Sequence, residues 1–112
     1  MENGELLANI ISDILFKLGF NNTVMGFYYL VDAIILVNKY NYSCIGEIET
    51  VIADSHNTTS YCVEQCMRYC IDKHLRKSLS YTQEFFDYNT KNITTSRLIY
   101  KIHYYLYKRE KK

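Results

Sequence analysis

A chain of 112 residues, 48% of them hydrophobic, is long enough for one domain with its own core and too apolar to be disordered. The absence of proline and the presence of only four glycines favour helices joined by short turns. The apolar run from Ile34 to Val37 is far too short to span a bilayer, and the first residues lack the pattern of a secretory leader. We therefore expect a cytoplasmic protein without a membrane partner.

Charge is distributed unevenly along the chain, although its net value is only +1. Residues 1–67 contain two basic and eight acidic residues, a net of −6, whereas residues 68–112 contain eleven basic and four acidic residues, a net of +7. This asymmetry indicates a polyanionic partner such as nucleic acid, or two faces of the molecule that match each other. A solvated basic tail is the other interpretation, because Lys108-Arg109-Glu110-Lys111-Lys112 alone supplies +3.

Apolar residues recur at three- and four-residue spacing along most of the chain, which predicts amphipathic helices. Gly19 is expected to end the first helix, and Gly26 is expected to mark close backbone packing of the second. No stretch alternates between apolar and polar residues, so we predict an all-α fold, a compact six-helix domain without a sheet. The predicted helices cover residues 6–18, 25–40, 45–54, 57–77 with their cap residues, 79–88 and 97–108.

A short helix, a tight turn and a long helix follow one another between Ile45 and Lys77, which is the spacing of a helix-turn-helix. Asn57, Thr58 and Thr59 are each able to cap the long helix. A helical wheel separates the long helix into two faces. The predicted buried side holds Val63, Cys66, Met67, Cys70, Ile71 and His74, and the predicted outer side holds Tyr61, Gln65, Arg68, Tyr69 and Asp72.

An ordered set of residues resembles the C-terminal DNA-binding (effector) domain of the sporulation response regulator, stage zero sporulation protein A. The resemblance covers roughly Ile10 to Leu106. It is carried by Leu18-Gly19-Phe20, Gly26-Phe27-Tyr28-Tyr29-Leu30, Ala33-Ile34, Asn57-Thr58-Thr59, Val63-Glu64, Arg68, Ile71, Phe86, Tyr88 and Thr94-x-Ser96. It implies a helix-turn-helix whose fourth helix enters the major groove, in a family that works below a receiver domain. We expect residues 1–112 to form one such domain, with no receiver domain.

The surface of the recognition helix departs from the family pattern. Cys62 and Gln65 stand where the family has arginines, and Tyr69 stands where it has a histidine, whereas Glu64 and Arg68 keep the family residue. Because arginine bound to guanine is the commonest specific base contact, these changes indicate a different DNA target. The predicted DNA-binding residues are Thr58, Thr59, Tyr61, Glu64, Gln65, Arg68 and Tyr69.

Cys62, Cys66, Cys70 and His74 follow one another at four-residue spacing, as a row of metal ligands would. A helix rises about 18 Å over twelve residues, so one zinc ion cannot contact all four side chains. A neighbouring pair helped by Cys44 or His56 remains an alternative, but we interpret Cys66 and Cys70 as small core residues and predict no metal and no cofactor. Phosphate loops, paired carboxylates and nucleophile motifs are missing, so we predict that the protein is not an enzyme.

Two functional hypotheses follow. The first is a sequence-specific DNA-binding transcriptional regulator, in which Thr58 and Thr59 contact phosphate while Tyr61, Gln65, Arg68 and Tyr69 read bases. The second is a diverged interaction module that does not bind DNA and modulates a full-length regulator or RNA polymerase. The candidate partners are double-stranded DNA, the sigma subunit of RNA polymerase and a second copy of the chain as a homodimer on DNA.

Overall fold

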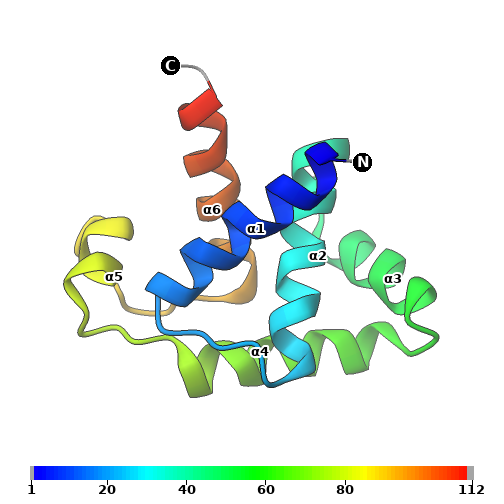
Figure 1. The fold of residues 1–112 in the computed structure, drawn as a ribbon. Coiled ribbons are helices and arrows are strands. Elements are labelled where there is room, and N and C mark those ends of the chain that lie inside the picture. Colours follow the sequence, from blue (N-terminus) through cyan, green and yellow to red (C-terminus); the bar gives the residue numbers. More distant parts are fainter. Residues whose placement is uncertain (1, 111–112) are drawn as a thin grey trace.

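The computed structural model describes the backbone of residues 2–110 and the side chains of residues 6–109. These residues form six α-helices and no strand, which confirms the predicted all-α fold (Figure 1). Of the predicted basic tail, Lys111 and Lys112 lie outside the described residues. The helices are α1 (Glu2–Lys17), α2 (Met25–Tyr40), α3 (Ile45–Ser55), α4 (Ser60–His74), α5 (Ser80–Phe85) and α6 (Thr95–Glu110).

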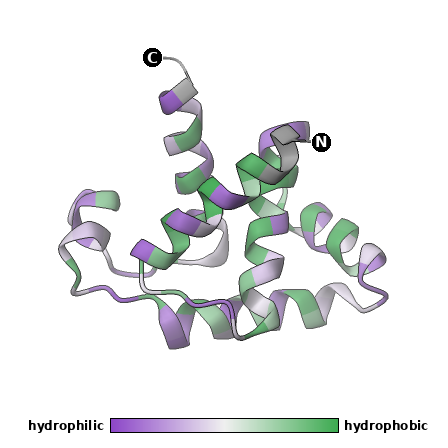
Figure 2. Ribbon diagram, in the orientation of Figure 1, coloured by the Kyte–Doolittle hydropathy of each residue, from purple (hydrophilic) through white to green (hydrophobic). Residues whose placement is uncertain are grey.

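Helix α2 lies at the centre of the molecule and contacts α1, α3, α4 and α6 (Figure 1). Figure 2 shows hydrophobic residues along much of α2, whereas the helices beside it carry both hydrophobic and hydrophilic residues. Because other helices surround it, α2 buries side chains on most of its circumference instead of on one stripe. Its buried residues are Gly26, Phe27, Tyr29, Leu30, Val31, Ala33, Ile34 and Val37.

The close packing predicted at Gly26 is present between α2 and α4. A Cβ atom built on Gly26 would lie 2.3 Å from the carbonyl oxygen of Cys66 and 2.7 Å from the Cβ of Cys70. Any larger residue would meet the backbone of α4 there. The absence of a side chain at Gly26 therefore sets how closely α4 approaches α2.

Gly19 ends α1 as predicted. Its φ of +109° is readily available only to glycine. The N–H of Gly19 donates to the carbonyl of Phe16, and the N–H of Phe20 donates to the carbonyl of Leu15, each at 3.0 Å. These two bonds form a Schellman motif that closes the end of the helix. The start of α1 differs from the prediction, because the helix begins at Glu2 instead of Leu6.

The fifth helix is shorter than predicted. Asp87 and Tyr88 have φ values of +54° and +65°, and an α-helix cannot continue through left-handed residues. Helix α5 therefore ends at Phe85 instead of Tyr88. The last helix is longer than predicted, because α6 covers Thr95–Glu110 instead of residues 97–108. The hydroxyl of Thr94 accepts a hydrogen bond from the N–H of Arg97 at 3.1 Å and caps this helix.

The tyrosines divide between core and surface. Tyr29 is buried and Tyr100 is half-buried, and the Tyr100 hydroxyl donates to the carbonyl of Tyr42 at 2.8 Å. Tyr29 therefore belongs to the core, and Tyr100 packs against it. Tyr28, Tyr104, Tyr105 and Tyr107 are exposed.

Candidate nucleic-acid interface

A four-residue turn, residues 56–59, joins α3 to α4. At its start, His56 Nε2 lies 3.0 Å from the carboxylate of Asp32, and the His56 ring meets the Tyr29 ring edge to face with centroids 5.1 Å apart. Asn57 adopts a left-handed φ of +57°, which asparagine tolerates better than most residues. The turn is thus attached to α2 while it redirects the chain into α4.

Of the three residues predicted to be able to cap α4, Thr59 is the one that does so. Its side-chain oxygen accepts a hydrogen bond from the N–H of Cys62 at 3.1 Å. Replacing such a cap by alanine typically costs about 1 kcal/mol. The neighbouring Thr58 is half-buried, and its N–H donates to the carbonyl of Ala53 at 2.9 Å. Both threonines therefore lie at the positive end of the α4 dipole, where an anion is favoured.

The inner face of α4 agrees with the helical wheel. Val63, Met67, Cys70 and Ile71 are buried, and Met67 has no exposed surface. Cys66 and His74, predicted on the same side, are half-buried. The apolar stripe packs against α2 and α3 and leaves the opposite side of α4 to solvent.

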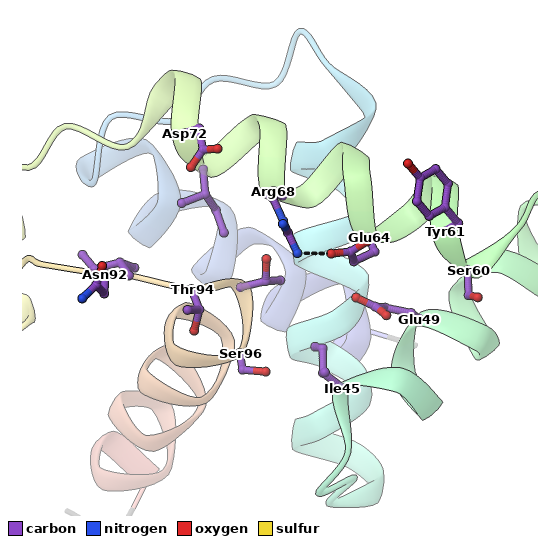
Figure 3. Close-up of a pocket in the computed structure, with 13 residues that line it drawn as sticks. Ile45, Glu49, Ser60, Tyr61, Glu64, Arg68, Asp72, Asn92, Thr94 and Ser96 are labelled. Carbon is purple, nitrogen blue, oxygen red and sulfur yellow. Dashed lines mark hydrogen bonds and ion pairs between the residues drawn. The ribbon is translucent and has the colours of Figure 1, made fainter.

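The outer face of α4 holds the predicted recognition residues. Tyr61, Gln65, Arg68 and Tyr69 are exposed, and Glu64 is half-buried. The Arg68 guanidinium forms an ion pair with the Glu64 carboxylate four residues earlier (Figure 3). Gln65 Nε2 lies 3.1 Å from the other oxygen of Glu64. The structure thus joins three predicted residues, Gln65, Glu64 and Arg68, through one carboxylate.

A groove of about 730 Å³ runs beside this face (Figure 3). The start of α3, the outer face of α4 and the segment 92–96 before and at the start of α6 form its walls. Tyr61, Glu64 and Arg68 are the predicted site residues that line it, whereas Thr58, Thr59, Gln65 and Tyr69 do not. The full lining is Ile45, Glu49, Ser60, Tyr61, Glu64, Arg68, Ile71, Asp72, Asn92, Ile93, Thr94, Thr95 and Ser96.

Glu49 is a groove residue that sequence analysis did not identify. It lies on α3 and is only 9% exposed. Burial raises the pKa of its carboxyl group, and the nearby charge of Glu64 raises that pKa further. The positive charge of Arg68 acts in the opposite direction. In the sequence, Glu49 is one of three acidic residues in α3, with Glu47 and Asp54, and nothing in that pattern tells a groove from a solvent-exposed position.

Arg97 holds the loop that forms the third wall of the groove. Its guanidinium donates to the carbonyl of Lys91 at 2.6 Å and to the carbonyl of Asn89. It also lies over the ring of Phe86, 5.3 Å from the ring centroid. The positive charge of Arg97 therefore serves loop closure, although the sequence counts it in the basic half of the chain.

The cysteines of α4 have the character of core residues. Cys70 is buried, and burial raises the pKa of its thiol to about 11. Burial also raises the pKa of Cys66, and its contact with Cys62 adds to the effect. A thiol with a raised pKa is a poorer ligand and a poorer nucleophile. In the part of the chain that the structure describes, no three His, Cys, Asp or Glu side chains are placed to share a metal ion.

None of the helices within residues 2–110 combines the length and the apolar character that crossing a membrane requires.

Helix α4 is capped and follows a short α3 and a tight turn, and its free face carries polar and aromatic side chains. This arrangement is that of a helix-turn-helix.

Comparison with known families gives the same class. The family described as sporulation initiation factor Spo0A C terminal matches residues 11–106, and the chain belongs to this family. The family consists of DNA-binding effector domains that regulate transcription in sporulation, and it is not a known enzyme family. A search of curated proteins found no match to the sequence.

Proposed function

We propose that this protein is a cytoplasmic, sequence-specific DNA-binding transcriptional regulator that places α4 in the major groove. One observation carries the proposal: the free face of the capped α4 presents Tyr61, Gln65, Arg68 and Tyr69 to solvent on one side of the helix. A helix of 15 residues is about 22 Å long, and a major groove about 12 Å wide admits it. Membership of the family supports the same activity.

The N-terminal half of α4 makes the base contacts in this proposal. Thr58 and Thr59 lie where the helix dipole attracts a phosphate group. Gln65 is suited to adenine and Arg68 to guanine, whereas Glu64 can accept a hydrogen bond from cytosine. To contact a base, Arg68 exchanges its bond to Glu64 for one to DNA. Recognition of guanine therefore includes the cost of breaking an ion pair within the protein.

The C-terminal end of α4 supplies phosphate contacts. Lys73, Arg76 and Lys77 are exposed in and just after its last turn, and Lys108 and Arg109 are exposed at the end of α6. Lysine and arginine near the backbone of DNA release counterions and make binding depend on salt. Asp72, exposed near Lys73, repels phosphate.

The test is a binding selection on random duplex DNA followed by salt titrations of the selected site. We expect Arg68→Ala to lower affinity for that site by about 1–3 kcal/mol and to relax the preference at one base position. Replacing Lys108 and Arg109 by alanine should weaken binding to all duplexes equally and flatten the salt dependence. Absence of DNA binding at low salt, or an Arg68→Ala variant with unchanged specificity, would refute the proposal.

Two protein partners belong to the same proposal. A second copy would bind as a homodimer on a DNA site with two half-sites, and the sigma subunit of RNA polymerase would be contacted from the bound position. Sedimentation of the protein with a duplex that carries one or two half-sites tests the first, and transcription from a promoter with the selected site tests the second.

An interaction module that does not bind DNA is the second candidate, and the charge of the groove favours it. The groove is lined by three carboxylates, from Glu49, Glu64 and Asp72, and by the single cation of Arg68. A polyanion would be repelled from such a lining. Failure of the DNA selection would therefore favour this candidate, which acts on a full-length regulator or on RNA polymerase.

A further inference from the structure

The carboxylate of Glu49 lies in the groove without a hydrogen-bond or ion-pair partner. Glu49 as a residue is only 9% exposed, and Figure 3 shows its carboxylate directed toward Glu64. Its oxygens still reach the groove, because the buried side-chain atoms without a partner in the described residues are those of Thr82 and His103. No hydrogen bond or ion pair joins it to any side chain or backbone group in residues 6–109. The nearest cation, Arg68, is paired with Glu64 instead. A carboxylate that opens only into the groove and has no partner in the protein is free to bind a cation that enters the groove.

The rest of the groove fits a long basic side chain. Ile45, Ile71 and Ile93 give it apolar surface, on which the methylene groups of lysine or arginine can pack. Ser60 and Thr94 add hydroxyl groups to the same lining, which can accept hydrogen bonds from a cation. The lining thus combines an apolar surface, hydrogen-bond acceptors and an excess of negative charge.

We propose that this groove binds a basic segment of a partner protein, with an arginine side chain of that segment reaching Glu49. The guanidinium is flat, weakly hydrated and carries five donors, so it can satisfy the Glu49 carboxylate and neighbouring oxygens together. Lysine brings one compact and strongly hydrated charge and should bind less tightly. This inference rests on the second candidate function and specifies its partner, and the groove shares Tyr61, Glu64 and Arg68 with the proposed DNA-binding face.

A second copy of the chain is a less suitable occupant. The exposed cations Lys108 and Arg109 lie at the far end of α6 from Thr94 and Thr95, which border the groove. Thirteen residues of α6 separate Thr95 from Lys108, which is about 20 Å. Two copies could exchange this contact reciprocally, and each would then have to bring the rigid end of a helix into the groove of the other. The occupant we infer is instead a basic segment of another protein.

The experiment measures fluorescence anisotropy of labelled octapeptides that carry two adjacent arginines among glycines and serines. Matched peptides carry lysines or glutamines instead. We expect the arginine peptide to bind most tightly and the glutamine peptide not to bind. Glu49→Gln should weaken binding of the arginine peptide by about tenfold or more, because it removes the charge of this carboxylate.

Glu47→Gln is the matched control, since Glu47 lies on the same helix, is exposed and does not line the groove. It removes the same formal charge and should change binding less than about twofold at moderate salt. Circular dichroism of both variants checks that they are folded. Equal weakening by the two variants would show diffuse attraction and overturn the proposal, and so would failure of the arginine peptide to bind at low salt.

Sedimentation equilibrium of the unlabelled protein separates the second copy from a partner protein. We expect a monomer at concentrations at which the peptide binds. Self-association that Glu49→Gln abolishes would make the second copy the occupant and would overturn the proposal of a different partner.

Discussion

Substitution of Gly26 by alanine tests how α2 positions the recognition helix. The added Cβ would lie 2.3 Å from the Cys66 carbonyl oxygen, whereas ordinary van der Waals contact begins at 3.4 Å. The neighbouring atoms are α4 backbone and the Cβ of Cys70, none of which can rotate away. To accept the methyl group, α2 and α4 must therefore separate by about 1 Å at this point, which loosens the packing around it.

The expected change in the free energy of unfolding is the difference between two opposing effects. Alanine in place of glycine inside a helix stabilises by about 1 kcal/mol. Inserting a methyl group into a well-packed core typically costs about 1–3 kcal/mol, and the rigid neighbours at Gly26 place this case at the upper end. We therefore expect Gly26→Ala to lower the free energy of unfolding by about 2 kcal/mol. For a domain of this size, that corresponds to a fall in Tm of roughly 8 °C.

Thermal and urea unfolding followed by circular dichroism measure this effect, and Gly46→Ala is the control. Gly46 lies in the first turn of α3, where an added Cβ would meet only the Sγ of Cys44 at 3.7 Å. Gly46→Ala should leave stability unchanged or raise it by up to about 1 kcal/mol. If Gly26→Ala raised the Tm as Gly46→Ala does, the contact between α2 and α4 would not be as close as described.

Two further predictions concern single side chains. Met67→Ala should lower the free energy of unfolding by about 2–5 kcal/mol, because Met67 is completely buried. Tyr69→Ala on the exposed side should change the free energy of unfolding by less than about 0.5 kcal/mol, and urea unfolding measures both variants. Burial and the nearby charge of Glu64 raise the pKa of Glu49 in the folded protein, so the free energy of unfolding falls as pH rises above the ordinary pKa of 4.5. Glu49→Gln removes this loss and should therefore raise the Tm at about pH 7. Thermal unfolding should show that this gain disappears at about pH 3.5, where the carboxyl group is protonated in both states, and a lower Tm for Glu49→Gln at neutral pH would contradict the reasoning.

Local sequence signals predicted most of the helices. The bounds of α2 agree with the prediction at both ends, and Gly19 ends α1 as expected. The end of α5 was wrong because the left-handed conformations of Asp87 and Tyr88 do not follow from their residue types alone. The start of α1 was wrong because the first residues carry few apolar side chains, which were the signal used to begin the helix.

The candidate site was predicted only where it depends on one helix. Helical periodicity placed Met67 inside and Arg68 outside, since both positions follow from the turn of α4. Glu49 and the segment 92–96 were not predicted, because their place beside α4 depends on contacts between parts of the chain far apart in sequence. The charge pattern of the sequence also did not show that Arg68 is paired with Glu64. This cation on the outer face of α4 already has a partner within the protein.

The closure of the loop by Arg97 has a consequence for how the groove responds to a ligand. One guanidinium holds the carbonyls of Asn89 and Lys91 and packs on Phe86, and Ile93 anchors the same loop in the core, so the loop opens by releasing these two side chains. Opening of this kind is local and needs far less free energy than global unfolding. A ligand that contacts Asn92 and Thr94 would favour the closed loop. Amide hydrogen exchange in this loop would then slow whenever the groove is occupied, whatever the chemical identity of the occupant.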